Sequence, residues 1–164
     1  METKTASTRT EGLVALFDLH TGLLERALKD LSEKDMHNRL DTKANHMAWL
    51  TGSLVAQRYL MASEIRPDMK QTGGELFKDN KGILEDVTYP TNDEYIHDWK
   101  AITPFAREGL AKLDDKKLDS ELDMGGMKMT WFEMISFTMY REASMIGQLA
   151  LWRRLLDHPA MRYD

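Results

Sequence analysis

Apolar residues recur at three- and four-residue steps along four long stretches of the chain. This spacing places apolar side chains on one face of an α-helix. The stretches span residues 12–31, 44–65, 91–110 and 130–157. The pattern therefore predicts an all-α protein with four long helices.

Two of these stretches begin with the sequence signature of a helix start. Thr91 is followed by Glu94, and Thr130 is followed by Glu133, the spacing of a capping box that satisfies free amides of the first helical turn. Pro104 lies inside the third stretch and is expected to kink or break that helix, because proline has no amide hydrogen.

The connections between the predicted helices differ in length. Turn-forming residues are frequent in residues 66–90, so a long crossover joins the second and third helices. Gly125–Gly126 marks either a tight hairpin or an extended loop before the fourth helix. No linker divides the chain, and we expect one domain over residues 1–164, a four-helix bundle with a long crossover.

Composition narrows the classes of function. The formal net charge is -5, and no cluster of basic residues with aromatics appears, so we expect neither nucleic-acid nor membrane binding. The chain has no cysteine, which excludes disulfides, thiolate catalysis and cysteine metal ligands. The opening residues "METKTASTRTEG" are polar and do not resemble a secretory signal. A cytoplasmic protein is expected.

Arg141 interrupts the apolar face predicted for the last helix. Steps of three and four residues place it on one face with Trp131, Met134, Phe137, Met145, Gln148, Trp152 and Leu155. A buried guanidinium requires an anionic partner, since an unpaired interior charge is very costly. Most such pairs are structural, which favours an internal acid such as Asp18, Glu25 or Asp98. The alternative is a pocket in which Arg141 binds an anionic ligand.

Two stretches carry a resemblance to a known family. "REASMIGQLALWRRLL" and "NHMAWLTGSLVAQRYL" resemble the last and second helices of DinB-like proteins, bacterial four-helix bundles that often bind a divalent metal. The family's last helix has the form His-Glu-Ala-x-His-x-Gly-Gln, and Glu142, Ala143, Gly147 and Gln148 match it. The resemblance implies the bundle fold.

The metal-ligand positions of that family are replaced in this chain. The two histidine positions of the last helix hold Arg141 and Met145, and the histidine position of the second helix holds Ser53. Arginine has no lone pair to donate, and a thioether and a neutral hydroxyl are weak ligands. We therefore expect that the family's metal site is lost and that no cofactor is bound.

Other residues could form a shifted site. His46 lies seven residues before Ser53, on nearly the same helix face, and His20 lies on the apolar face of the first helix. With Glu142 they could hold a metal, and the resemblance would then imply a metal-dependent hydrolase or a low-molecular-weight-thiol S-transferase. The sequence favours a site without metal, because a lone histidine on an apolar face is usually a hydrogen-bonded core residue.

The expected function is therefore binding of a small, anionic ligand or of a protein partner, without metal chemistry. The candidate ligand-binding residues are Ser53, Arg141, Met145, His46, His20 and Glu142. Homodimerisation is expected as well, because the resemblance implies pairing through faces of the bundle.

Overall fold

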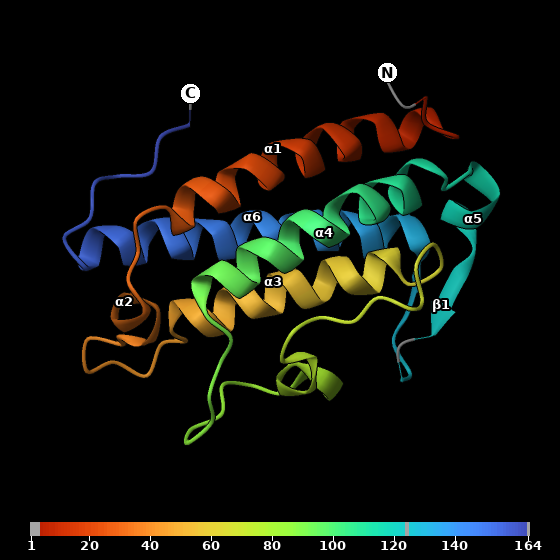
Figure 1. The fold of residues 1–164 in the computed structure, drawn as a ribbon. Helices are drawn as coiled ribbons and strands as arrows, with labels where there is room; N and C mark the ends of the chain where they lie inside the picture. Colours follow the sequence, from red (N-terminus) through yellow and green to blue (C-terminus); the bar gives the residue numbers. More distant parts are fainter. Residues whose placement is uncertain (1–3, 124, 164) are drawn as a thin grey trace.

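The computed structural model describes residues 4–123 and 125–163 and is mostly helical, which confirms the all-α class (Figure 1). Four long helices account for most of the chain. They are α1 (Glu11–Leu28), α3 (Met47–Ala62), α4 (Asn92–Ala111) and α6 (Trp131–Leu155).

Shorter elements connect the long helices. They are η1 (Thr8–Thr10), α2 (Glu33–His37), η2 (Gly74–Leu76), η3 (Lys78–Asn80), α5 (Asp115–Asp119), β1 (Glu121–Asp123) and β2 (Lys128–Thr130). β1 and β2 pair antiparallel, and Gly125 and Gly126 take φ angles of 72° and 101° in the turn between them. The hairpin alternative is therefore confirmed. The sequence predicts one short helical piece within residues 66–90, where η2 and η3 lie. The other short helices, α2 and α5, were not predicted, because they are too short to show a helical period.

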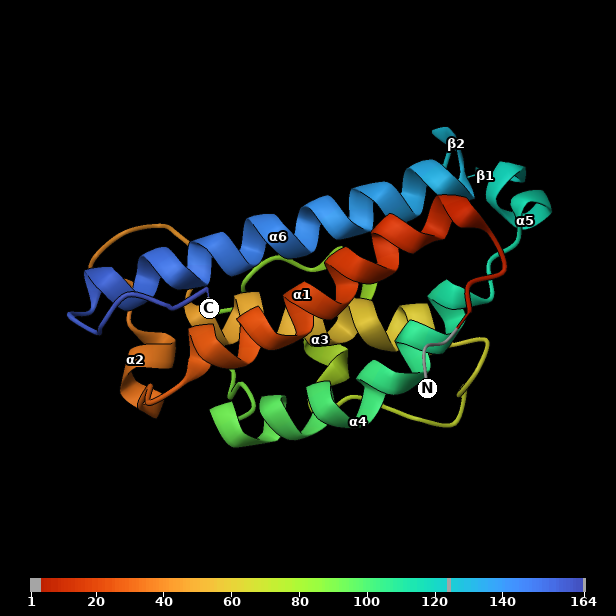
Figure 2. The ribbon, with the colours of Figure 1, turned by 90° about the horizontal axis from the view of Figure 1, so that it is seen from above.

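The four long helices lie side by side. α1 packs against α4 and α6, and α3 packs against the same two helices. α1 and α6 run in one direction while α3 and α4 run in the other, as Figures 1 and 2 show. Parallel neighbours require a long connection, and residues 66–90 supply it between α3 and α4.

Most helix ends follow the sequence signals. Thr91 and Thr130 form the predicted capping boxes with Glu94 and Glu133. α4 continues through Pro104 without a break.

Three helix boundaries differ by three residues from the predicted ones, and one of them is the end of α3, which lies at Ala62 instead of Ile65. α1 ends at Leu28, before Asp30, which has a positive φ of 61°. α3 begins at Met47, and His46, predicted inside the helix, is its N-cap.

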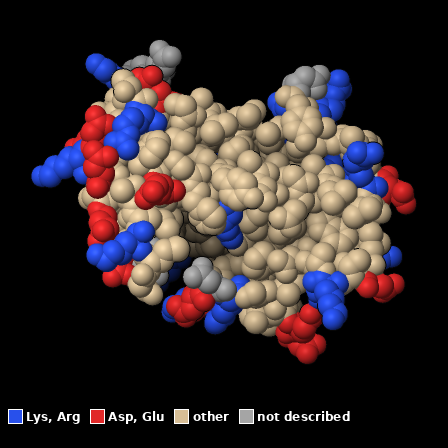
Figure 3. Space-filling view, turned by 180° about the vertical axis from the view of Figure 1, so that it is seen from behind, with Lys and Arg blue, Asp and Glu red and all other residues tan. Residues whose placement is uncertain are grey.

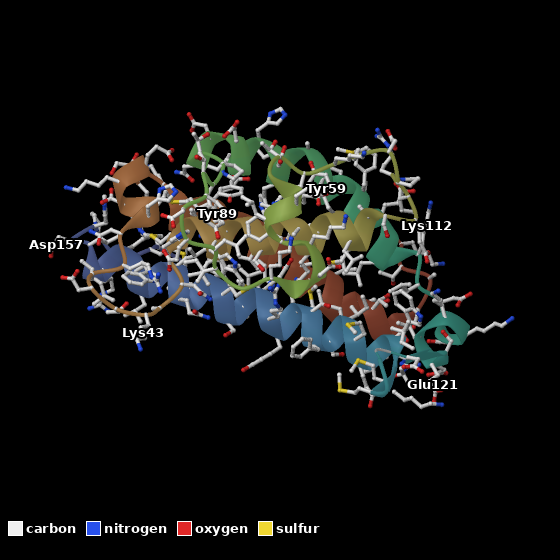
Figure 4. All side chains as sticks on the ribbon, turned by 90° about the horizontal axis from the view of Figure 1, so that it is seen from below. Lys43, Tyr59, Tyr89, Lys112, Glu121 and Asp157 are labelled. Atoms are coloured by element: carbon white, nitrogen blue, oxygen red, sulfur yellow. The ribbon has the colours of Figure 1, made fainter. Side chains whose placement is uncertain are left out.

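The crossover covers one side of α3, as the view from below shows (Figure 4). Phe77 of the crossover packs directly over Gly52, where an added Cβ would lie 2.1 Å from its Cζ. Gln71 donates to the Gly52 carbonyl at 2.8 Å, and the Thr72 amide donates to Asp98 at 2.6 Å. These contacts attach the crossover to both α3 and α4.

The inward face of α6 differs from the predicted one. Its centre is Glu142, which is fully buried, and not Arg141, which is half-buried. Phe137, Gln148 and Leu155 of the predicted face are exposed. The prediction failed because apolar side chains lie on both faces of this helix, so spacing alone did not identify the buried one. In the described part of the chain, no helix is long and apolar enough to span a membrane.

Candidate functional site

Arg141 lies at the boundary between α6 and α3. Its Nη2 donates to the Ser53 hydroxyl at 2.6 Å, and its Nη1 donates to the Gln57 side-chain oxygen at 2.7 Å. Both acceptors come from α3 and both are neutral. The structure thus brings together Ser53 and Arg141, two of the predicted site residues.

The favoured internal ion pair of Arg141 is not formed. The three acids considered have other partners: Asp18 pairs with Arg107 at 2.8 Å, Glu25 with Lys100 at 3.4 Å, and Asp98 accepts from the Thr72 amide. Within residues 4–123 and 125–163, no carboxylate forms an ion pair with Arg141. The physical reason is position, since Asp18 and Glu25 lie on the side of α1 that faces α4.

The charge of Arg141 is only partly solvated. Burial lowers the pKa of its guanidinium, and the charge of Glu142 acts in the opposite direction. Arginine starts from so high a value that it keeps its proton at neutral pH. Two of its five N–H groups have protein acceptors among the described residues, which leaves three for a ligand or water.

A shallow groove of ≈ 270 Å³ opens beside Arg141. Its lining residues are Asn45, Trp49, Leu50, Phe137, Tyr140, Arg141, Ser144, Met145 and Gln148. They include one cation, no acid, and Met145 of the predicted site. Trp49 Nε1 is buried and has no hydrogen-bond acceptor in the described structure.

The surface around α6 carries few charges. Figure 3 views the molecule from behind, the side on which α6 lies in Figure 1. In this view, uncharged residues cover the middle of the surface, and most charged side chains lie near its edges. A hollow lies in the middle beside one basic side chain.

A separate polar network lies inside the protein. Arg58 of α3 and Glu142 of α6 are both 0% exposed and form a two-point ion pair, with Nε–Oε1 3.0 Å and Nη2–Oε2 3.2 Å. The Arg58 guanidinium lies 3.8 Å from the Phe17 ring centroid and 3.5 Å from that of Trp99. These two rings belong to the two core clusters, so the pair joins them.

Hydrogen bonds complete the solvation of this pair. Arg58 donates to the hydroxyls of Thr21 and Thr103 at 2.7 and 2.9 Å and to the Phe17 carbonyl at 3.3 Å. His20 Nδ1 lies 3.2 Å from Glu142 Oε2 and donates to it. Burial opposes ionisation of Glu142, but the hydrogen bonds and charges of His20 and Arg58 outweigh it and hold its pKa below the usual value.

This network corrects the expectation for two predicted site residues. Glu142 and His20 are buried, and neither lines the groove beside Arg141. Both Glu142 oxygens already accept hydrogen bonds from the protein. The two residues therefore hold α1, α3 and α6 together and are not placed to contact a ligand in the groove.

His46 has a different place and role. As the α3 N-cap, its Nδ1 accepts a hydrogen bond from the Trp49 amide at 3.0 Å. Its ring lies 5.3 Å from that of His37 and 4.8 Å from that of Tyr89. Burial and the neighbouring His37 lower its pKa from 6.5 to about 4.

His46 therefore does not join His20 and Glu142 in a shifted site. Among the residues that the structure describes, no cluster of three or more His, Cys, Asp or Glu could hold a metal ion.

Sequence reasoning missed Arg58, the centre of the buried network. A signal was present, because Arg58 follows Leu50 and Leu54 at four-residue steps and precedes Ala62 by four. All four positions are buried. The pairing of Arg58 with Glu142 could not be predicted, since it depends on how α3 and α6 pack.

Comparison with known proteins gives no assignment. The chain matches no protein-family model, and no curated protein sequence is significantly similar to it.

Proposed function

We propose that this chain is a DinB-like four-helix bundle that binds a small anionic ligand in the groove between α3 and α6, with Arg141 as the recognising cation. One observation carries the proposal: Arg141 is half-buried, lines the groove and forms no ion pair with a described carboxylate. A partly desolvated guanidinium with free N–H groups is suited to a carboxylate or phosphate oxygen.

The arrangement of three positions supports the family assignment. The resemblance places metal ligands at positions 53, 141 and 145. Ser53 contacts Arg141 directly, and Met145 lines the same groove. The fixed charge of Arg141 would repel a cation at the place where the resemblance puts a metal, and it would attract an anion instead.

The proposal is tested by calorimetric titration with acetate and with inorganic phosphate. We expect Arg141→Gln to weaken binding of these probes about tenfold or more, the usual value of a charge-assisted hydrogen bond. Arg154→Gln is the matched control, because Arg154 is exposed on α6 outside the groove. Equal binding by wild type and Arg141→Gln, or no binding by either, would overturn the proposal.

A metal measurement separates this proposal from the hydrolase or S-transferase alternative. We expect less than one equivalent of divalent metal per chain in protein purified without chelator, and no increase in thermal stability on adding Zn²⁺. One equivalent of metal that is lost in His20→Ala would favour the alternative instead.

We also propose that two copies of the chain pair through the outer face of α1 and α6. On α1, Leu16 and Leu19 are exposed on the side turned away from Asp18, which pairs with α4. On α6, Leu151 and Leu155 are exposed, and no charged residue is exposed between Glu133 and Arg154. A neutral, apolar face can meet its own copy around a two-fold axis without like-charge repulsion.

The glycines of this face support close approach of a second copy. An added Cβ at Gly12 or Gly22 of α1 would meet nothing within 4 Å, so packing within the chain does not require glycine there. The absence of a side chain lets another helix approach more closely.

A further inference from the structure

The lining of the groove beside Arg141 is unusual in combining one charge with several aromatic rings. Its only charged residue among those described is Arg141, and three of its side chains are aromatic: Trp49, Phe137 and Tyr140. A ligand that fits this lining needs both an anionic group and an apolar surface. The inference that follows rests on the proposed function and specifies its ligand.

The charge of the groove favours a monoanion. Arg141 supplies a single positive charge, and no second Lys or Arg lines the groove in the described structure. A dianion such as hydrogen phosphate would leave one negative charge unpaired in a partly desolvated place, which is unfavourable. A carboxylate can accept two parallel N–H bonds from one guanidinium and matches its charge.

Hydrogen-bond donors are in excess at this place. Three N–H groups of Arg141 have no protein acceptor among the described residues. A ligand that brings acceptor oxygens corrects this imbalance, because unsatisfied buried donors are costly.

The part of the groove wall that α6 forms next to Arg141 offers apolar surface. Phe137 is 55% exposed and Tyr140 is 68% exposed, with ring centroids 6.3 Å apart and planes tilted by 37°. A flat ring placed against them would bury apolar area and gain aromatic contacts. The volume of ≈ 270 Å³ lies just below the range of about 300–1,000 Å³ found for ligand cavities, which favours one ring over a long chain or a nucleotide.

We infer that the groove binds a small aromatic monocarboxylate, with its carboxylate on Arg141 and its ring against Phe137 and Tyr140. Aromatic contact supplies affinity, and the guanidinium fixes the orientation of the ligand.

The experiment compares four probes by calorimetric titration: benzoate, acetate, inorganic phosphate and benzamide. Acetate has the charged group without the ring, and benzamide has the ring without the charge. We expect benzoate to bind at least about tenfold more tightly than each of the other three.

Two variants test which residue contacts the ring of the ligand and which contacts its carboxylate. Phe137→Ala is expected to reduce benzoate affinity severalfold and to leave acetate affinity unchanged, whereas Arg141→Gln reduces both. Leu60→Ala is the control, because Leu60 is an exposed apolar residue of α3 outside the groove. Phe137 is largely exposed, so its truncation is not expected to unfold the protein.

The outcomes separate this inference from the proposed function. If acetate and phosphate bind through Arg141 but benzoate binds no more tightly, the aromatic ligand class is wrong and the anion site stands. If benzamide binds as well as benzoate, or Phe137→Ala leaves benzoate affinity unchanged, the inference is also overturned. If no anion binds in an Arg141-dependent way, the proposed function itself fails.

Discussion

Arg58 and Glu142 place two opposite charges at the centre of the protein, where charges are normally excluded. Their solvation is replaced by a two-point ion pair, by two threonine hydroxyls and by two aromatic rings. Such a pair contributes little net stability compared with apolar residues of the same size, but removing one partner leaves a buried charge uncompensated. This asymmetry can be measured.

Replacement of Arg58 alone is expected to be severe. Arg58→Met leaves the Glu142 carboxylate buried without its main partner, and we expect the free energy of unfolding to fall by about 3–5 kcal/mol. Urea denaturation measures this loss. The double variant Arg58→Met/Glu142→Leu removes both charges and should be clearly more stable than Arg58→Met. If the double variant lost as much free energy of unfolding as Arg58→Met and Glu142→Leu lose together, the two residues would not be a coupled pair.

His46 predicts a dependence of stability on pH. Its pKa is 6.5 in the unfolded chain and about 4 in the folded protein, so the unfolded state binds more protons between these values. The contribution of His46 to the free energy of unfolding is therefore fully present above about pH 6.5. It is lost as the pH falls toward 4, and the loss amounts to at most about 3 kcal/mol.

The variant His46→Asn isolates this contribution. Asparagine is a good N-cap and does not titrate. Between pH 6.5 and 4, the free energy of unfolding of His46→Asn, measured by urea denaturation, should therefore fall less than that of wild type. His97→Asn, at an exposed position of α4, is the control and should follow the wild-type curve. Identical curves for His46→Asn and wild type would exclude this role of His46.

At the scale of elements, the crossover is attached to α3 by a close contact that depends on Gly52. The ring of Phe77 and the hydroxyl of Tyr95 occupy the space where a Cβ would lie, at 2.1 and 2.6 Å. Gly52 weakens α3 as a helix, since glycine is a poor helix former, yet it admits the crossover. The parallel arrangement of α3 and α4 thus depends on one small residue as well as on the length of residues 66–90.

Gly52→Ala is expected to destabilise the protein although alanine favours helix. Displacing Phe77 should cost about 1–3 kcal/mol, which exceeds the gain in helix propensity of about 1 kcal/mol. We expect faster proteolysis within residues 66–90 and lower stability in urea. Gly147→Ala is the matched control on α6, where nothing lies within 4 Å, and it should stabilise the folded chain by up to about 1 kcal/mol. A stabilising Gly52→Ala would show that the crossover is not packed in this way in solution.

At the scale of the whole molecule, charge is distributed unevenly over the surface. Ion pairs such as Asp18–Arg107 and Glu25–Lys100 lie between α1 and α4, while the outer face of α1 and α6 is largely uncharged (Figure 3). The groove beside Arg141 opens at the α3 edge of this face. A homodimer through α1 and α6 would bury the apolar residues of the face.

The dimer is tested by light scattering after size-exclusion chromatography. Wild type should have twice the 19.0 kDa mass of one chain. Leu151→Asp puts a charge at the proposed interface and should yield the monomer. Leu60→Asp changes an equally apolar residue that is 74% exposed on α3, and it should keep the mass of wild type. A monomeric wild type would overturn the proposed pairing.

The sequence by itself determined the elements that depend on local chemistry. Helical periodicity and the capping boxes at Thr91 and Thr130 predicted the long helices, because helix formation depends on residues three and four apart. The turn-forming residues Gly125–Gly126 limited the connection before the last helix to two alternatives, a tight hairpin or an extended loop. The sequence placed Arg141 on the inward face of the last helix, whereas the structure places it half-buried at the edge of that face.

Only the tertiary structure decided which charges meet. Arg58 and Glu142 are 84 residues apart, and their pairing depends on how α3 and α6 pack, which local spacing does not specify. The same packing turned Glu142 inward and left Arg141 at the groove. Neighbouring residues on a helix point about 100° apart, so only one of these two side chains can face the core. Because α6 has apolar side chains on both faces, the sequence did not show which of the two it would be. For that reason the sequence predicted an internal ion pair for Arg141, whereas in the structure the neutral side chains of Ser53 and Gln57 accept its hydrogen bonds.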